Sequence, residues 1–157
     1  MNRLARIPSP WLVVLAVASA VIVTVLIRTV GQLAGGSFEF TSPTGPAFVD
    51  HRTVAGFTTV PLAIGLTVVA VLGRWWGWVF SVAMVVAPVL ELGSILGMTV
   101  PADFDLVSKL TLAACHVALV PVSLLAIGAL RARRRARQRQ VDAAARPAPQ
   151  PELIVGA

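Results

Sequence analysis

Three ionisable side chains, Arg28, Glu91 and His116, stand inside long apolar segments of this 157-residue chain. An ionisable group within hydrocarbon is costly unless it faces the bundle interior or water, so such a residue indicates function by default. A carboxylate, a guanidinium and an imidazole can together bind a ligand or move a proton. Two interpretations follow: a proton- or ligand-handling site, or a structural Arg–Glu pair with a hydrogen-bonded histidine.

The three residues are predicted to lie at similar depths. Each stands 15 to 17 residues from the same end of its apolar segment. At about 1.5 Å per residue, these separations place all three roughly 22–26 Å from one membrane boundary. We therefore expect one polar layer in the outer half of a helical bundle. In the alternative, Arg28 extends its side chain to the outer surface.

The sequence offers no catalytic or metal-ligating motif. The single cysteine, Cys115, excludes an intrachain disulfide and a multi-cysteine metal site. On a helix it points about 100° away from His116, which is poor geometry for a nucleophilic pair. A glycine-rich phosphate loop, a Gly-x-Ser-x-Gly turn and a His-Glu-x-x-His motif are all missing from the sequence. We predict no catalytic residue, no metal and no cofactor, and we leave open a membrane enzyme using a His–Glu–Arg set.

The composition indicates that these residues are positioned by membrane-spanning helices. Apolar residues make up 57% of the chain and charged residues 13%, against about 25% charged in soluble domains. A spanning helix needs roughly 20 mostly apolar residues. The sequence predicts an all-α, antiparallel four-helix transmembrane bundle. Its expected helices are about 11–30, 54–72, 75–96 and 106–130, with an outer loop at 31–53 in which a short hairpin is possible.

The positive charges predict the orientation of the bundle. Arginines concentrate in the N-terminal segment 1–10, at Arg74 in the second connection and in the segment 131–157, whereas acids dominate the other two connections. Positive residues beside helix ends favour the cytoplasmic side. We expect a bacterial inner-membrane protein with a cytoplasmic N-terminus at 1–10, a membrane domain at 11–130 and both termini inside. The fourth helix should continue through the arginines and fray before Pro147, and the remaining tail should be disordered.

One end of the predicted bundle is rich in arginine and tryptophan. A basic cluster beside a membrane attracts anionic lipid at about 1 kcal/mol per residue. Nucleic-acid binding is a poor alternative because no aromatic residue interleaves with the arginines. Tryptophan favours the headgroup level. The predicted anionic-lipid contacts are Arg131, Arg133, Arg134, Arg135, Arg137 and Arg139, and the predicted interface anchors are Trp11, Trp75, Trp76 and Trp78.

Small residues recur at four-residue spacing on two of the expected helices. Ala20 and Thr24 continue a ridge that leads to Arg28 on the first helix, and Ala83 and Ala87 lead toward the glutamate of the third. Small ridges let helix backbones approach closely in lipid. We interpret both ridges as packing surfaces.

Several short motifs give the chain a family resemblance. They are Gly45-Pro46, Ser94-Ile95-Leu96-Gly97, Lys109-Leu110-Thr111-Leu112 followed by His116-Val117, and the arginine-rich end. Over about residues 8–135 the chain resembles a family of small bacterial four-helix membrane proteins known only as a domain of unknown function. That family usually has Ser-Leu-Leu-Gly-Pro where this chain has Gly97-Met98. The resemblance implies an integral membrane protein and supplies no activity.

Two functional hypotheses follow from the sequence. In the first, the protein is non-enzymatic and packs with itself or with a membrane-protein partner. In the second, it is a small proton-coupled transporter acting as an oligomer, with Glu91 titrating and Arg28 and His116 tuning it. For this second hypothesis, the chain resembles the small multidrug exporters in helix number. Those exporters carry their essential glutamate in the first helix, whereas this chain has it in the third. In either case the partners are the lipid bilayer, anionic lipid at the tail and a possible second copy.

Overall fold

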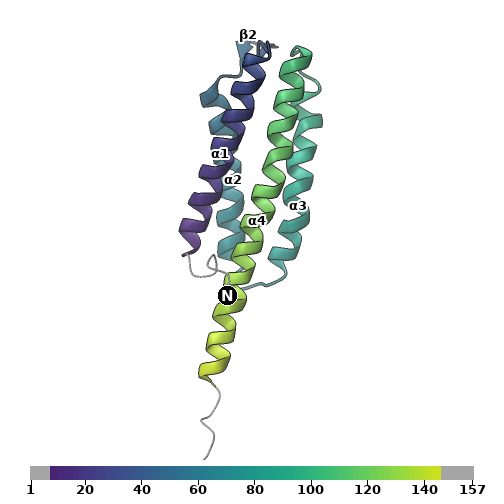
Figure 1. The fold of residues 1–157 in the computed structure, drawn as a ribbon. Helices are drawn as coiled ribbons and strands as arrows, with labels where there is room; N and C mark the ends of the chain where they lie inside the picture. The colour runs from purple at the N-terminus through teal and green to yellow at the C-terminus, as the bar shows by residue number, and fades with distance from the viewer. Residues whose placement is uncertain (1–7, 146–157) are drawn as a thin grey trace, which may run out of the picture.

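The computed structural model describes residues 8–145, which form four long helices and one hairpin (Figure 1). Each of the four helices is long and apolar enough to cross a membrane, the third together with the short π-helix that follows it. The predicted set of four membrane-length helices is therefore confirmed. The elements are α1 (Ser9–Leu33), β1 (Glu39–Ser42), β2 (Gly45–Phe48), α2 (His51–Leu72), α3 (Val79–Ser94), the π-helix η2 (Ile95–Thr99) and α4 (Leu106–Ala144).

The fourth helix is the structural centre of the bundle. Helix α4 packs against α1, α2 and α3, whereas no Cα atom of α1 lies within 8 Å of one in α3, both of which are fully described. It also extends well beyond the other three helices at one end, as Figure 1 shows. This arrangement decides which of the intramembrane polar residues can meet, because side chains on α1 and α3 lie across the bundle from each other.

The boundaries of two helices differ from the sequence prediction. Helix α2 begins at His51 because the carboxylate of Asp50 accepts a hydrogen bond from the Thr53 amide at 2.7 Å and so caps the helix. Helix α3 begins at Val79 rather than at 75, and the preceding residues form turns. Glycine at position 77 disfavours a helix there.

The extension of the fourth helix is confirmed. Helix α4 continues through the arginine-rich segment to Ala144, since Arg, Ala and Gln are strong helix formers. The predicted N-terminal arginines at 3 and 6 lie outside the described residues, as do Arg146 and the proline-rich segment expected to be disordered.

The first connection contains the hairpin that the sequence left open, so the fold is a helical bundle with a small β element. Strands β1 and β2 pair antiparallel, with Glu39 opposite Phe48 and Ser42 opposite Gly45. Gly45 has a φ of +120°, a conformation that glycine adopts readily. The Phe40 ring lies 5.1 Å from that of Phe104, which joins the hairpin to the connection before α4.

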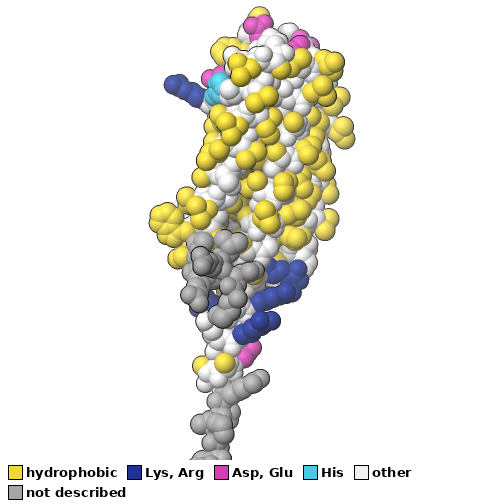
Figure 2. All heavy atoms as spheres, viewed as in Figure 1, with side chains coloured by type: hydrophobic (Ala, Val, Ile, Leu, Met, Phe, Trp, Pro, Cys, Tyr) yellow, Lys and Arg dark blue, Asp and Glu magenta, His cyan; other side chains and the backbone are white. Residues whose placement is uncertain are grey.

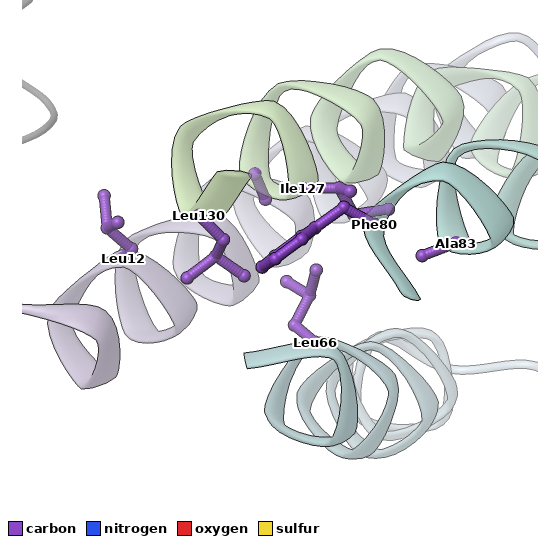
Figure 3. Close-up of a cluster of buried hydrophobic side chains, with 7 residues drawn as sticks. Leu12, Leu66, Phe80, Ala83, Ile127 and Leu130 are labelled. Carbon is purple, nitrogen blue, oxygen red and sulfur yellow. The ribbon is translucent and has the colours of Figure 1, made fainter. Parts of the chain in front are cut away.

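The two ends of the bundle differ in the kind of side chain they bury. We call the end with the hairpin and the start of α4 the hairpin end, and the end with residues 73–78 and 130–139 the arginine end. Side chains from all four helices form the apolar core nearer the arginine end (Figure 3). Between the ends, apolar side chains cover the outer surface (Figure 2), as expected for a surface that faces lipid. The core residues are Leu12, Leu66, Phe80, Ala83, Ala126, Ile127 and Leu130.

The predicted packing ridge on α1 is confirmed. Ala20 and Thr24 are fully buried, and Thr24 Oγ1 lies 3.2 Å from Thr58 Oγ1 on α2. The thiol of Cys115 on α4 donates a hydrogen bond to the Thr24 carbonyl oxygen. Small side chains on α1 therefore allow polar contacts with both neighbouring helices.

Candidate functional site

Arg28 is buried at the hairpin end with only 5% of its surface exposed. Its Nε donates a hydrogen bond to the Val49 carbonyl oxygen at 3.1 Å, and its Nη1 donates to Gln32 Oε1. The same Nη1 lies 3.2 and 3.3 Å from the two ring nitrogens of His51. The guanidinium is thus satisfied by α1 and by the connection leading into α2.

Phe38 completes the surroundings of this guanidinium. Its ring centre lies 4.6 Å from Arg28 Cζ, within the range of a cation–π interaction. Phe38 has a φ of +57°, which is unusual for a residue other than glycine. Its amide donates to Ser108 Oγ at 2.8 Å, and its carbonyl oxygen accepts from the Val49 amide at 2.8 Å. The backbone is therefore held from both sides in the conformation that places the ring beside Arg28.

Two carboxylates connect the hairpin region to the start of α4. Asp105 caps α4 by accepting from the Ser108 amide at 2.9 Å, and it also accepts from the Ser37 amide at 3.0 Å and the Ser37 hydroxyl at 2.8 Å. Asp103 accepts from the Thr41 amide at 2.8 Å. The hydrogen bonds from Ser108 and then Ser37 lower the pKa of Asp105, and the hydrogen bond from Thr41 lowers the pKa of Asp103.

Glu91 and His116 belong to a second polar group, between α3 and α4. Glu91 Oε2 accepts a hydrogen bond from Ser123 Oγ at 3.1 Å. Ser94 Oγ donates to the Glu91 carbonyl oxygen at 2.6 Å and lies 2.8 Å from His116 Nδ1. Ser94 therefore bridges the backbone of Glu91 and the His116 ring. We call Glu91, Ser94, His116 and Ser123 the α3–α4 polar strip.

The structure places Glu91 and His116 in one polar strip and leaves Arg28 apart. The Glu91 carboxylate is hydrogen-bonded to Ser123, and its backbone carbonyl group is bridged by Ser94 to the His116 ring. The Arg28 guanidinium donates instead to Val49 and Gln32. The expected contact between Arg28 and Glu91 is therefore not formed. A transporter mechanism in which Arg28 tunes Glu91 by direct contact is not supported by this geometry.

Sequence reasoning missed the residues that complete both polar groups. Ser123 follows His116 by seven residues and so shares its face of the helix, and Ser94 follows Glu91 by three. This periodicity was available from the sequence. His51 and Phe38 carried no such signal, because their positions depend on how the connection between α1 and α2 folds.

A groove lies beside the α3–α4 polar strip. It has a volume of about 460 Å³, its walls are α2 and α3, and α4 contributes Leu119, Ser123 and Ile127. Most of its lining is apolar, and Glu91 with Ser123 contributes polar atoms to it. The groove therefore combines an apolar surface with one carboxyl group within the membrane-spanning part of the chain.

The predicted basic cluster contributes to a pocket at the arginine end. Four arginines line this pocket of about 330 Å³, one from the connection after α2 and three from α4. The predicted interface anchors on this side, Trp11 and the tryptophans at 75, 76 and 78, are all exposed. The lining arginines are Arg74, Arg133, Arg134 and Arg137; the other predicted lipid contacts, Arg131, Arg135 and Arg139, are not among the lining residues.

A family model matches residues 5–139, and its description is "Family of unknown function (DUF6069)". The chain belongs to DUF6069. The match spans α1 to α3 completely and α4 through the arginine-rich segment, so it covers both polar groups and the arginine pocket. No curated protein and no solved structure matches the chain. Membership of DUF6069 therefore assigns no activity, and the four membrane-length helices come from the structure.

The described residues also bear on a possible metal site. Within residues 8–145, no group of three or more His, Cys, Asp or Glu side chains is arranged to hold a metal ion. In the α3–α4 polar strip, the neighbours of Glu91 and His116 are serine hydroxyls. The arrangement is suited to hydrogen bonding between helices.

Proposed function

We propose that this chain is a non-enzymatic protein of the bacterial inner membrane, and that it packs against a further transmembrane helix along the groove between α2 and α3. The helix comes from a second copy or from another membrane protein. The observation that carries this proposal is the groove itself, an open apolar surface with a carboxyl group at its margin.

Small residues on both walls of the groove support helix packing. Gly65 on α2 and Ala83 and Ala87 on α3 line it. A Cβ added at Gly65 would meet no atom within 4 Å, so the surface there is open. Transmembrane helix interfaces are enriched in such residues because they let two backbones approach closely.

Glu91 and Ser123 at the groove favour a protein helix as the occupant, rather than lipid chains alone. Glu91 accepts one hydrogen bond, from Ser123, although a carboxylate has about four acceptor sites. Acyl chains offer no donor, whereas Ser, Thr, Asn, Gln or His on an incoming helix would. Interhelical hydrogen bonds of this kind contribute about 0.6 kcal/mol on average.

The charge distribution supports placing both termini in the cytoplasm. Arginine predominates at the arginine end of the described chain, and the connections at the hairpin end carry Glu39, Asp50, Asp103 and Asp105 against Arg52 and Lys109. Positive residues in short connections favour the cytoplasmic side.

Cross-linking from a single engineered cysteine tests the packing proposal. In a Cys115→Ala background, we would introduce Gly65→Cys in the groove, or Ile22→Cys on the exposed face of α1 as the matched control. A photoactivatable thiol cross-linker would be attached and activated in native membranes.

We expect one discrete cross-linked protein band from position 65 and none from position 22. A band of twice the chain mass identifies a second copy, and a different mass identifies another protein. Lipid adducts alone at position 65, or equal protein cross-linking from both positions, would overturn the proposal.

A further inference from the structure

The pocket at the arginine end gathers four arginine side chains that the packing of the helices does not require. We propose that it is a binding site for the phosphate headgroup of an anionic membrane lipid. The site consists of Arg74, Arg133, Arg134 and Arg137 below an apolar wall.

The charge of the pocket points to an anion. Its four arginines come from two separate parts of the chain, and the described lining residues include no carboxylate. Like charges gathered around one cavity repel each other, and a bound anion relieves that repulsion. Guanidinium groups bind phosphate oxygens through two parallel hydrogen bonds, which gives them geometric specificity for this ligand.

One of the arginines is held by a hydrogen bond, and a second lies close to the connection after α2. Arg133 Nη1 donates a hydrogen bond to Ser9 Oγ at the start of α1. The guanidinium of Arg134 lies against Gly77, where an added Cβ would be 2.2 Å from Nη1. A guanidinium that is already positioned loses less conformational freedom when it binds a phosphate.

The position of the pocket favours a lipid over a soluble phosphate. Its other wall includes Ala70, Phe80 and Leu130, of which Phe80 and Leu130 belong to the buried core (Figure 3). The adjacent exposed Trp75 and Trp76 are typical of the headgroup level of a bilayer. Dark-blue basic side chains gather where the apolar surface ends (Figure 2). A lipid can place its phosphate among the arginines while its chains follow the apolar surface.

Because only some of the exposed arginines line the pocket, a specific binding site can be told apart from general attraction to the membrane. Arg134, Arg137, Arg135 and Arg139 are all exposed and all lie on α4, yet only the first two line the pocket. General electrostatic attraction depends on the number of charges near the bilayer. A specific site depends on which arginines are removed.

This difference defines a matched pair of variants. The pocket variant is Arg134→Gln with Arg137→Gln, and the control variant is Arg135→Gln with Arg139→Gln. Each removes two charges from exposed positions on α4. The full chain would be reconstituted in phosphatidylcholine vesicles containing brominated phosphatidylglycerol, which quenches tryptophan fluorescence on contact. All four tryptophans of the chain lie at the arginine end, so the quenching reports on lipid there.

We expect brominated phosphatidylglycerol to quench the wild-type tryptophans more strongly than the same fraction of brominated phosphatidylcholine does, which shows a preference for the anionic lipid. The control variant should keep that preference. The pocket variant should lose about tenfold in relative affinity for each arginine removed, the loss expected for a charge-assisted hydrogen bond to phosphate. Equal losses in both variants would show diffuse attraction and overturn the proposal. Inorganic phosphate at millimolar concentration should leave the wild-type preference unchanged; if it abolishes the preference, the pocket binds soluble phosphate and the lipid assignment is wrong.

Discussion

The guanidinium carbon of Arg28 lies 4.6 Å from the centre of the Phe38 ring. Phe38 is fully buried, and its amide and carbonyl groups are hydrogen-bonded to Ser108 and Val49. A single residue of the first connection thus contacts α1 through its ring, α4 through its amide and the segment just before α2 through its carbonyl group. The packing of the hairpin end depends on this residue, although the apolar core lies nearer the other end.

Replacing Phe38 with alanine should destabilise the fold substantially. The change removes a fully buried ring and the contact with Arg28, and Phe→Ala substitutions in cores cost about 3–5 kcal/mol. The free energy of unfolding in detergent micelles would measure the loss. Phe48→Ala in the same hairpin is the matched control, because the Phe48 side chain is exposed. Equal effects of the two substitutions would contradict the role assigned to Phe38.

Replacing Gly31 with alanine should destabilise the contact between α1 and α4. A Cβ at this position would lie 2.2 Å from Thr111 Oγ1 and 2.8 Å from Thr111 Cβ, so the helices would have to separate. Overpacking of this kind costs about 1–3 kcal/mol. Gly56→Ala on α2 is the control, because its added Cβ meets no atom within 4 Å.

Unfolding measurements in the same detergent would compare the two alanine variants. We expect Gly31→Ala to be clearly less stable and Gly56→Ala to be nearly unchanged. Adding Thr111→Gly to Gly31→Ala should recover part of the loss, because it removes every side-chain atom that clashes. No recovery in the double variant would argue against a close helix contact at this position.

The helices could be predicted from the sequence because their signals are local. Apolar length sets the spans, and the Asp105 cap and the helix-forming arginine segment set the two ends of α4. The start of α3 was placed too early, because an apolar aromatic run looks helical although Gly77 interrupts it. Local signals were therefore sufficient for the number of helices and insufficient for one boundary.

The polar contacts could be predicted only in part because they depend on helix rotation and neighbours. Equal depth placed Arg28 and Glu91 in one layer, yet depth does not say which helices touch. The Ser94 bridge between the Glu91 carbonyl group and the His116 ring required α3 to lie beside α4, which the structure shows. The surroundings of Arg28 required the fold of a connection with a residue at positive φ, and no periodic pattern encodes that.

The stability of the fold should fall in acid because Asp105 joins the hairpin region to α4. Its pKa in the folded chain lies below the ordinary aspartate value of 3.8, because Ser108 and Ser37 donate hydrogen bonds to its carboxylate. The ionised group therefore contributes stability above about pH 4, and that contribution is lost as the pH falls through the folded pKa. We expect the thermal midpoint of the wild-type chain in detergent to decrease between about pH 5 and pH 3.

The variant Asp105→Ala isolates this contribution. It should be less stable than the wild type near neutral pH and should show a smaller decrease over the same acid range. Asp103 retains its hydrogen bond from Thr41 in this variant, so a residual pH dependence is expected. An acid-induced decrease as large as that of the wild type would show that another group is responsible.

The orientation of the bundle can be tested with an impermeant thiol reagent. In the Cys115→Ala background, Thr44→Cys places a thiol in the exposed hairpin turn and Gln140→Cys places one on the exposed part of α4. Reagent added to the outside of intact cells should label position 44 and not position 140. After the cells are opened, both positions should react. Labelling of position 140 alone in intact cells would reverse the orientation inferred from charge.

The separation of the two polar groups predicts that Arg28 and Glu91 are energetically independent. They share no hydrogen-bond partner, and no Cα atoms of their two helices lie within 8 Å of each other. In a double-mutant cycle with Arg28→Leu and Glu91→Leu, the change in the free energy of unfolding of the double variant should equal the sum of the two single changes within about 0.5 kcal/mol. Glu91→Leu with Ser123→Ala is the matched positive control, because these side chains are 3.1 Å apart across α3 and α4. That cycle should give a coupling of about 0.6 to 1.7 kcal/mol. A coupling between Arg28 and Glu91 larger than that of the control would restore the single polar layer and contradict the arrangement described above.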